Sequence, residues 1–320
     1  MERKVLILTD GKAGHENQSK AFARALGCDF DLVEIHFKSA FHKALSYLFD
    51  HLGIHTLSLF ANHAPLAPQT TNHKPLTTNH STYSAVLGTG SGTFYAAKSL
   101  ARRMSVKCGV VLYPRGYRIA SFDCVLAPAF DRPAPAPNVI TIPVNLVASD
   151  EAFYAAGTEA FRARYTPSEK PAVAVIVGGP NKCSTMSADW MKAQLESIFA
   201  DTPGAEHWVT TSRRTPPEVE SIVESFPFDY KLLYSKDHFN PIPAFVKLAR
   251  TLYVTAESTG MISESCTFGT AEVRVLDNLK PGSHKFRCFV EDLARGGYVD
   301  GARKVDLSEQ FTRARQLLNL

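Results

Sequence analysis

Three short polar loops in the second half of the chain carry the residue types that hold phosphate groups. They are residues 178–182 (GGPNK), 211–216 (TSRRTP) and 257–261 (ESTGM), and each directly follows an apolar run. Charge-assisted hydrogen bonds contribute about 1.5–3 kcal/mol each. The entropy cost of ordering the side chains and the ligand offsets part of this energy. The three loops together would therefore bind a diphosphate with at best roughly micromolar affinity. The alternative for the adjacent arginines is a solvated pair or a salt bridge to a carboxylate.

The third of these loops lies inside a predicted strand–loop–helix–strand unit at residues 251–276. The helix would have Ser258 or Thr259 as its N-cap and would end at Gly269. A helix start offers free N–H groups and a partial positive charge, so an anion belongs there. Glu264, about one turn further on, could accept two hydrogen bonds from a diol such as a ribose. The alternative is that these side chains only cap the helix and favour its dipole.

The first half places another polar loop, residues 9–19 (TDGKAGHENQS), after the buried apolar run 5–8. Ligands of open α/β sheets bind at such carboxyl ends. Histidine is the side chain type in this loop whose unperturbed pKa lies near neutrality, which makes His15 a candidate general base. Asp10 is a weaker candidate, either as a base or as the group that orients one. The alternative is that these side chains only cap the helix or the turn.

A glycine-rich loop, residues 88–93 (GTGSGT), follows a further apolar run, and it would lie beside the first loop if the two strands are neighbours. Neither loop carries the Gly-Lys-Ser/Thr of a phosphate-binding P-loop. The third glycine of the dinucleotide fingerprint is replaced by Thr93, so a nicotinamide-dependent oxidoreductase is disfavoured.

The elements that must position these loops alternate strand and helix throughout the chain, which predicts an α/β protein with parallel sheets. Two βα halves are expected: residues 1–165, and residues 171–305 after a short polar linker. A final helix, within residues 306–320, would follow. The predicted strands are residues 5–8, 30–37, 83–87, 106–113, 124–127, 139–144, 172–177, 208–211, 231–234, 251–255 and 271–276.

Composition limits the classes of function. The 320 residues are 45% hydrophobic and carry a net charge of +4, which suits an anionic small molecule and not a nucleic-acid partner. Six scattered cysteines without metal-binding spacing indicate reduced thiols and a cytoplasmic protein. No apolar run reaches the length of a membrane span, and the N-terminus reads as a strand and not as a signal peptide.

Residues 40–60 form an apolar stretch rimmed by lysine and histidine, beginning with a predicted amphipathic helix at residues 40–52. It could dock on a membrane, at the inner face of which the protein would then be peripheral, or on a lipid-linked acceptor. The alternative is that the stripe is ordinary core. Residues 61–82 repeat Thr-Asn-His and read as a surface loop, with histidines spaced unlike a metal site.

Several motifs resemble the Elm-type mitochondrial fission protein family, which has many bacterial members and is similar to glycosyltransferases and nucleotide-sugar 2-epimerases of the GT-B architecture. The longest are residues 8–19, 209–216 and 254–264, supported by 138–139, 239–241 and 285–286. The resemblance covers nearly the whole chain and is weakest at residues 59–82. The chain has Glu257 where the family pattern leads us to expect Asp.

The resemblance implies two Rossmann-like domains facing a central cleft, with a nucleotide-diphosphate sugar in the second half. Glu264 would take the ribose hydroxyls, and residues 237–240 would meet the base. The implied nucleotide-sugar-binding residues are Gly178, Gly179, Asn181, Lys182, Ser212, Arg213, Arg214, Ser258, Thr259, Met261 and Glu264.

The first half would hold the acceptor, with His15 and Asp10 as catalytic residues and the C-terminal helix packing back onto this half. The resemblance implies neither a metal nor a cofactor beyond the sugar substrate. The implied acceptor-side residues are Gly11, Lys12, Gly14, Glu16, Asn17, Gly88, Gly90 and Ser91.

Three functions therefore stay open. The first is a metal-independent GT-B glycosyltransferase, and the second is a nucleotide-sugar epimerase on the same fold, which needs two acid/base groups flanking one sugar carbon. The third is a non-enzymatic GT-B-like binding or scaffold protein. The sugar, the base, the acceptor and the oligomeric state are not specified by the sequence.

Overall fold

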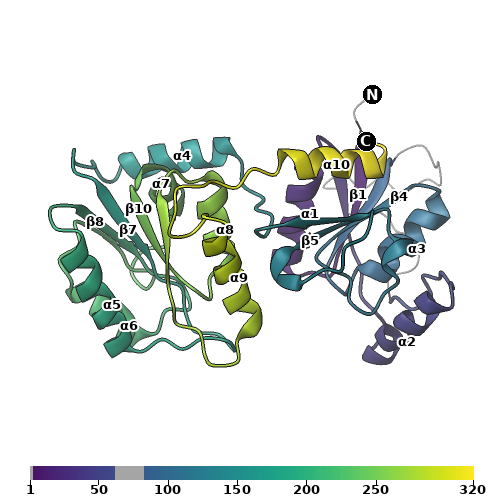
Figure 1. Cartoon of the computed structure of the whole chain (residues 1–320), viewed down its shortest axis with the longest axis horizontal. Coiled ribbons are helices and arrows are strands. Elements are labelled where there is room, and N and C mark those ends of the chain that lie inside the picture. Colours follow the sequence, from purple (N-terminus) through teal and green to yellow (C-terminus); the bar gives the residue numbers. More distant parts are fainter. Residues whose placement is uncertain (1–2, 62–82) are drawn as a thin grey trace. The chain divides into compact units, whose positions relative to one another are not determined.

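The computed structural model of the chain describes residues 3–61 and 83–320, which form two compact units, each built on one parallel sheet (Figure 1). The N-terminal unit comprises Met1–Ala148 and Leu307–Leu320, and the C-terminal unit comprises Ser149–Asp306. The Asn-, Thr- and His-rich segment at residues 62–82 lies outside the described residues.

The N-terminal unit contains a six-stranded sheet in the order β2-β1-β3-β4-β5-β6, with every neighbouring pair parallel. Its central strands are buried along their length, which explains why they read as continuous apolar runs. The strands are β1 (Lys4–Thr9), β2 (Asp29–Glu34), β3 (Ala85–Thr89), β4 (Lys107–Val111), β5 (Cys124–Pro128) and β6 (Val139–Ile142).

The described residues of this unit form four α-helices: α1 (Ala13–Ala25), α2 (Ala40–His51), α3 (Phe94–Met104) and α10 (Ser308–Leu318). Two short 3₁₀ turns, η1 (Ile119–Ser121) and η2 (Ala129–Asp131), flank β5. Helix α10 packs against β4, β5 and β6, as expected for a C-terminal helix that returns to the first half.

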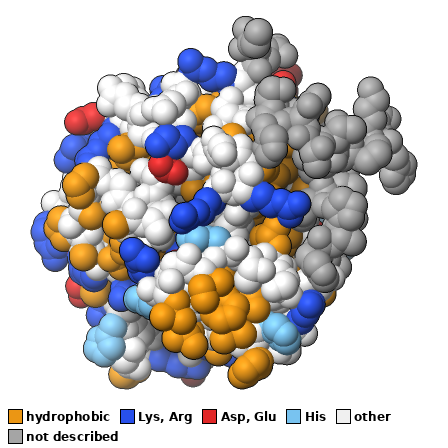
Figure 2. All heavy atoms as spheres, turned by 90° about the vertical axis from the view of Figure 1, so that its right-hand side faces the viewer, with side chains coloured by type: hydrophobic (Ala, Val, Ile, Leu, Met, Phe, Trp, Pro, Cys, Tyr) orange, Lys and Arg blue, Asp and Glu red, His pale blue; other side chains and the backbone are white. Residues whose placement is uncertain are grey.

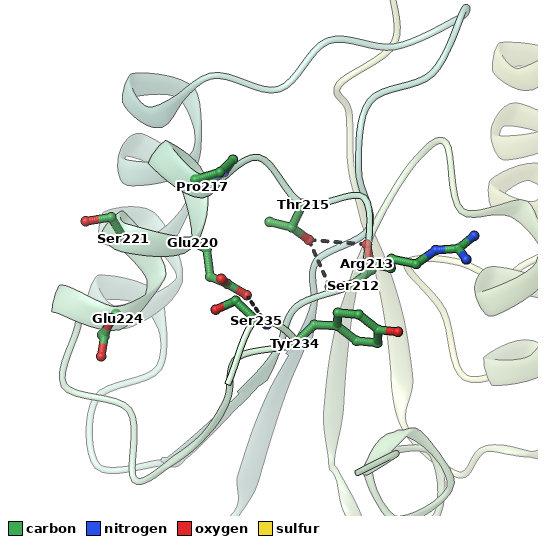
Figure 3. Close-up of a pocket in the computed structure, with 9 residues that line it drawn as sticks. All are labelled: Ser212, Arg213, Thr215, Pro217, Glu220, Ser221, Glu224, Tyr234 and Ser235. Atoms are coloured by element: carbon green, nitrogen blue, oxygen red, sulfur yellow. Dashed lines mark hydrogen bonds between the residues drawn. The ribbon is translucent and has the colours of Figure 1, made fainter. Parts of the chain in front are cut away.

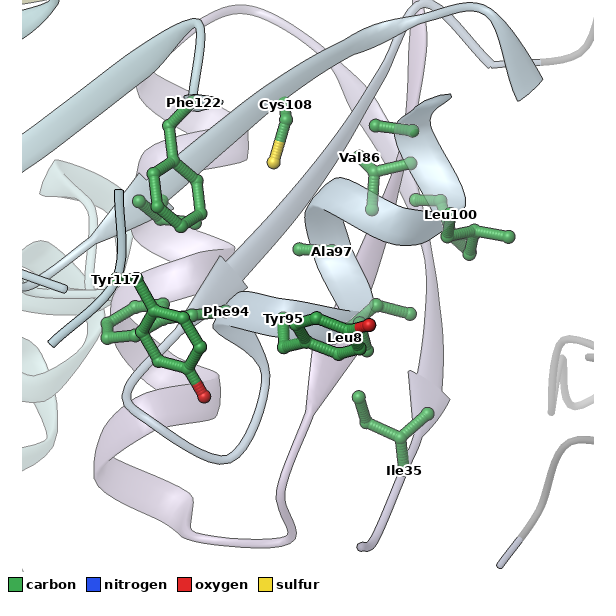
Figure 4. Packing of buried hydrophobic residues seen from close by; sticks show 14 of the residues in the cluster. Leu8, Ile35, Val86, Phe94, Tyr95, Ala97, Leu100, Cys108, Tyr117 and Phe122 are labelled. Carbon is green, nitrogen blue, oxygen red and sulfur yellow. The ribbon is translucent and has the colours of Figure 1, made fainter. Parts of the chain in front are cut away.

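The core on one side of this sheet is built from aromatic and aliphatic side chains of α3 and the strands. Phe94 and Tyr95 of α3 are fully buried against Leu8 and Val86, and Phe94 meets Tyr117 edge-on (Figure 4). This packing fixes the sheet and therefore the loops at its carboxyl edge.

The C-terminal unit contains a five-stranded parallel sheet in the order β11-β10-β7-β8-β9. The strands are β7 (Ala172–Ile176), β8 (Glu206–Thr210), β9 (Tyr230–Leu232), β10 (Thr251–Thr255) and β11 (Glu272–Leu276). The helices are α4 (Glu151–Arg162), α5 (Ala188–Asp201), α6 (Pro217–Ser225), α7 (Ile242–Leu248), α8 (Thr259–Phe268) and α9 (His284–Arg295).

Helix α4 is part of the C-terminal unit, whereas the sequence assigned residues 149–165 to the N-terminal domain. Its Phe161 is fully buried against Trp208 and Phe245, with ring centroids 5.3 and 5.9 Å away. The helix therefore covers the second sheet, and the expected domain boundary lies one helix too far along the chain. Asp150 caps the helix, accepting a hydrogen bond from the Phe153 amide at 2.9 Å.

The predicted fold class is confirmed: both units are Rossmann-like, and all eleven predicted strands are present with shifts at their ends. Helix α9 is not among the predicted helices. Residues 54–60, expected to prolong the apolar segment after α2, are irregular and end in a bridge between Phe37 and Phe60.

Candidate functional site

The three polar loops of the C-terminal unit lie side by side at the carboxyl ends of adjacent strands. Strand β7 pairs with β10 on one side and with β8 on the other, in parallel register. The loop after β7 therefore lies between the loop after β8 and the loop after β10. This arrangement gathers the predicted binding residues at one edge of the sheet.

Glycine is required where the middle loop passes its neighbours. A Cβ added to Gly178 would lie 2.0 Å from Glu257 Oε1 and 2.3 Å from Ser258 Oγ, and one on Gly179 would lie 2.2 Å from the Arg214 carbonyl oxygen. Both glycines are buried. The double glycine thus lets three loops close on one another.

Glu257 joins two of these loops through a buried carboxylate. Its Oε1 accepts hydrogen bonds from the Gly179 amide at 2.8 Å, the Thr255 hydroxyl at 2.9 Å and the Ser258 hydroxyl at 3.0 Å. Its Oε2 accepts from the Asn278 side chain at 2.7 Å. The sequence placed Glu257 at the start of the third polar loop and as a departure from a family pattern, but it gave this residue no role. A carboxylate placed directly after a buried strand was the signal that could have identified it.

Thr215 holds the loop after β8 against Gly178 by a hydrogen bond. Its hydroxyl donates to the Gly178 carbonyl oxygen at 2.6 Å and accepts from the Ser212 amide at 2.8 Å. Thr215 therefore has a structural role that the sequence analysis did not assign. The predicted ligand Ser212 takes part in the same turn.

The two arginines of this loop are exposed, and neither forms an ion pair within the described parts of the chain. The salt-bridge alternative for the pair is therefore not realised there. The loop lies beside a hollow of about 300 Å³ that residues of α6 also line. Figure 3 shows that the Arg213 side chain points away from Glu220 of α6. The hollow is lined by Ser212, Arg213, Thr215, Pro217, Glu220, Ser221, Glu224, Tyr234 and Ser235.

The start of α8 has one of the two predicted N-cap residues, but that residue makes no capping hydrogen bond. Ser258 occupies the N-cap position, but its hydroxyl donates to Glu257 and makes no capping hydrogen bond. The first helical hydrogen bond runs from the Ile262 amide to the Ser258 carbonyl at 3.0 Å, so the amides of residues 259–261 precede it. A Cβ on Gly260 would meet nothing within 4 Å. The positive end of α8 therefore opens onto free space at Gly260, while Thr259 and Met261 on either side are partly buried.

Glu264 is mostly buried, and a residue from another helix holds it. The Tyr154 hydroxyl of α4 donates to Glu264 Oε1 at 2.8 Å. Burial raises the pKa of Glu264, and the hydrogen bond from Tyr154 offsets part of that rise. One oxygen is thus engaged by the protein, so a ribose diol would share the carboxyl group with Tyr154.

The remaining predicted residues of the middle loop divide into one that shapes the loop and one that faces solvent. Asn181 Oδ1 accepts from the Cys183 amide at 2.7 Å and from the Ser184 hydroxyl at 3.2 Å, which fixes a turn. Lys182 is exposed. Its ammonium group is therefore the cation that this loop presents to solvent.

In the N-terminal unit, Asp10 and His15 form a hydrogen-bonded pair. His15 Nδ1 lies 2.9 Å from Asp10 Oδ1, and Lys12 Nζ lies 2.8 Å from Asp10 Oδ2. Burial works to raise the pKa of Asp10, but the hydrogen bonds from Lys12 and His15 outweigh it and hold that pKa below its usual value. A carboxylate on Nδ1 fixes the ring tautomer and leaves Nε2 to accept a proton.

The loop after β3 packs directly on this pair because β1 and β3 are neighbours. Gly90, at φ +82°, lies under the imidazole: a Cβ there would be 2.3 Å from His15 Cε1. A Cβ on Gly92 would be 2.7 Å from the Asp10 Cβ. The two loops therefore meet as the sequence suggested, and Gly92 is a contact that it did not single out.

The first loop is shorter than its sequence indicates, because α1 already begins at Ala13. Gly14, His15, Glu16 and Asn17 consequently lie on the first turns of a helix. Other predicted acceptor-side residues have local partners. Glu16 pairs with Lys20 at 2.5 Å, and the Ser91 hydroxyl accepts a hydrogen bond from Lys43 at 2.8 Å. The two glycines are closely packed: a Cβ on Gly11 would lie 2.6 Å from Glu34, and one on Gly88 would lie 2.7 Å from Thr93.

Neither a metal cluster nor a membrane-spanning helix is found in residues 3–61 and 83–320. No three or more His, Cys, Asp or Glu side chains are grouped there to hold a metal ion. No helix in those ranges is long and apolar enough to cross a membrane. The six cysteines are free thiols.

Comparison with known proteins connects this geometry to a family and a fold. The model of the family described as Mitochondrial fission ELM1 matches residues 13–317. No curated protein sequence matches the chain. Among solved structures, MurG of Acinetobacter baumannii is 14% identical with a TM-score of 0.51, over 99% of this chain and 92% of that chain. This likeness shows a GT-B-like fold.

Two further structures have slightly lower similarity. The S. aureus MnaA–UDP co-structure is 12% identical with a TM-score of 0.49, over 99% of this chain and 97% of that chain. The UDP-GlcNAc 2-epimerase from Neisseria meningitidis, bound to UDP-GlcNAc, is 13% identical with a TM-score of 0.49, over 99% and 92% of the two chains.

Proposed function

The chain belongs to the mitochondrial fission ELM1 family, and from that premise we propose that it is a metal-independent glycosyltransferase of GT-B type that uses a nucleotide-diphosphate sugar. The GT-B fold is shared with glycosyltransferases and UDP-GlcNAc epimerases. One observation carries the proposal: three loops are locked together around Gly178 and Gly179, and they present Arg213, Arg214 and the open start of α8 at one edge of a parallel sheet.

In this proposal the diphosphate binds between the arginines and the start of α8. The guanidinium groups donate charge-assisted hydrogen bonds to phosphate oxygens, and the amides of residues 259–261 supply further donors. Glu264 accepts from the ribose hydroxyls while Tyr154 keeps its carboxyl group in place. Lys182 adds a third cation from the middle loop, and the loop at residues 237–240 meets the base.

The proposed reaction is an inverting displacement at the anomeric carbon. His15 Nε2 takes the proton of the acceptor hydroxyl, whose oxygen forms the new bond to that carbon. The bond from the carbon to the diphosphate breaks, and the diphosphate leaves with the electron pair. Arg213, Arg214 and the α8 dipole stabilise the negative charge that develops on it. Asp10 holds the His15 ring in the tautomer that the step needs.

The acceptor side is proposed to be the N-terminal unit, at the paired loops after β1 and β3. A lipid-linked acceptor would suit this unit, because residues 40–60 place an exposed apolar helix next to the loop after β3, through the contact of Lys43 with Ser91. On this view the protein acts in the cytoplasm, at the inner face of a membrane.

A thermal-shift titration with UDP, GDP, CDP and ADP tests the donor site. A ligand that binds only the folded state stabilises it by about 2.7 kcal/mol at a hundred times its dissociation constant. We expect a shift with one nucleotide, lost in Arg213→Ala and in Glu264→Ala. The matched control is Arg162→Ala, because Arg162 is an exposed arginine lining a hollow at the starting ends of β7 and β8.

The outcomes separate the remaining functions. A shift with one nucleotide that both variants lose leads to screening its sugars for transfer, and isomerisation of the free nucleotide sugar in that screen would identify an epimerase instead. No shift with any of the four nucleotides would contradict the proposal and would favour the non-enzymatic scaffold.

A further inference from the structure

Helix α2 buries two polar residues and exposes part of its apolar surface, while its Leu45, Tyr47 and Phe49 pack, partly buried, against the core of the N-terminal unit. Its two fully buried side chains are Ser46 and Asp50. Phe41, Leu48 and Leu52, which follow one another at helical spacing along a single stripe, are 69%, 54% and 64% exposed. A helix that only covered a core would not leave such an apolar stripe in solvent.

The buried contacts fix α2 in this orientation. Asp50 pairs with Lys98 of α3, and its Oδ2 accepts from the Arg118 amide at 2.6 Å. The Ser46 hydroxyl lies 2.8 Å from the Tyr117 hydroxyl, and Tyr47 stacks on Tyr117 with ring centroids 4.3 Å apart. The helix is therefore held by specific polar and aromatic contacts, so turning the apolar stripe inward would break a buried ion pair.

The exposed apolar residues are concentrated at this place. Five large hydrophobic side chains are exposed in the described parts of the chain, and four of them lie between residues 41 and 54: Phe41, Leu48, Leu52 and Ile54. The fifth, Phe153, belongs to the C-terminal unit. A contiguous exposed apolar patch of this kind marks an interaction surface.

Within residues 35–61 and at the neighbouring Arg118, the exposed charged side chains have one sign. Between residues 35 and 61 the sole carboxylate is Asp50, which is buried and paired. The exposed charged side chains near the patch are Lys38 and Arg118, whose guanidinium lies beside Gly53, together with the imidazole of His51. Figure 2 shows the orange patch with blue and pale-blue groups around its edge. An apolar stripe with a cationic border complements a surface of acyl chains under anionic headgroups.

We propose that α2 is a peripheral membrane anchor that docks this unit on anionic lipid. Phe41, Leu48, Leu52 and Ile54 enter the boundary between headgroups and acyl chains, while Lys38 and Arg118 contact lipid phosphates. The absence of any exposed carboxylate from residues 35–61 favours an anionic lipid surface over a protein groove. The attachment is independent of the transferase proposal, because it requires only the N-terminal unit's surface.

Vesicle flotation tests the anchor with the full-length protein. Vesicles of phosphatidylcholine alone are compared with vesicles that contain phosphatidylglycerol, at low and high salt. We expect binding to the anionic vesicles that weakens with salt, and a loss of about tenfold or more in partitioning for the triple variant Phe41→Ser, Leu48→Ser, Leu52→Ser. Lys38→Glu should weaken binding to the anionic vesicles and leave binding to vesicles of phosphatidylcholine alone unchanged.

Phe153→Ser is the matched control, since it removes an exposed aromatic side chain from the other unit and should leave flotation unchanged. The triple variant should unfold at the wild-type temperature, because all three side chains already face solvent. Absence of vesicle binding, or equal binding by the triple variant, would overturn the proposal. It would also be overturned if sedimentation showed a wild-type dimer that the triple variant dissociates, with no lipid binding.

Discussion

The carboxylate of Glu257 accepts a hydrogen bond from the backbone amide of Gly179 at 2.8 Å, across the gap between the loops after β10 and β7. This contact is possible because Gly178 lacks a side chain that would occupy the same space. Two loops 78 residues apart in sequence are thereby held as one surface. The candidate donor site depends on this surface. The contacts that hold the loops together can therefore be tested by variants that leave Arg213, Arg214 and Lys182 unchanged.

Replacing Gly178 with alanine should displace the loop after β7. The added methyl group would lie 2.0 Å from Glu257 Oε1, so we expect a loss of about 2–3 kcal/mol in the free energy of unfolding and a loss of nucleotide binding. Urea unfolding measures the first and the thermal-shift titration measures the second. Gly260→Ala is the stability control, because its methyl group would meet nothing within 4 Å. An unchanged unfolding midpoint in Gly178→Ala would show that the loop is not held as described.

Replacing Glu257 with alanine should be more damaging than replacing an exposed carboxylate. Four donors, from Gly179, Thr255, Ser258 and Asn278, would lose their acceptor in a buried site. Each unsatisfied buried donor costs about 1–3 kcal/mol, so a total loss of about 3 kcal/mol or more is expected. Glu257→Asp should be intermediate, since the shorter side chain cannot reach Gly179 and Asn278 together. Chemical denaturation of the three proteins provides the ranking, and wild-type stability in Glu257→Ala would contradict it.

Replacing Glu264 with glutamine should stabilise the protein in a pH-dependent way. Burial raises the folded-state pKa of Glu264 above its ordinary value of 4.5, so the folded state binds the proton more tightly than the unfolded state does. Stability therefore falls as pH rises from that ordinary value through the raised pKa, and it stays reduced above it. The variant should melt higher than wild type at pH 8, with a difference that disappears toward pH 4.5. Glu196→Gln, at an exposed position, should show no such trend, and a wild type that is the more stable at pH 8 would refute the burial argument.

Replacing His15 with asparagine should remove catalysis and leave donor binding intact. General base catalysis contributes about 10²–10⁴-fold, and the donor loops belong to a different unit of the chain. Asp10→Asn should cause a smaller loss, since it disturbs the tautomer of His15 without removing the ring. The measurement is release of nucleoside diphosphate from a nucleotide sugar that contains the nucleotide giving the thermal shift. Full turnover by His15→Asn would exclude His15 as the base.

The sheets were predictable because their strands are buried on both faces and read as uninterrupted apolar runs. The short apolar runs at residues 172–177 and 251–255 indicate buried strands. The polar residues that follow these strands then lie at the carboxyl edge of the sheet. Helix α9 was missed because its face toward the core is narrow: Phe289 and Leu293 are its buried residues, surrounded by charged side chains.

The site could be predicted only to the level of loops. That Tyr154 holds Glu264 depends on α4 packing in the C-terminal unit, 110 residues away in sequence. Periodicity shows that α2 is amphipathic, but it does not show which face points inward. The buried pair of Asp50 with Lys98 decides that question, and a single sequence does not reveal which charges will be partners.

Helix α10 closes the first unit with residues that the ribosome adds only after the whole second unit has been made. Its Leu318 is fully buried, close enough to Gly109 of β4 that a side chain there would collide with it, and Arg315 donates to the carbonyl oxygens at the end of α1. During translation, the surface of β4, β5 and β6 that α10 covers therefore stays exposed until residues 149–306 have been synthesised. The unit that is synthesised first is completed last, so its exposed apolar sheet face is the part of the nascent chain with the longest need for protection.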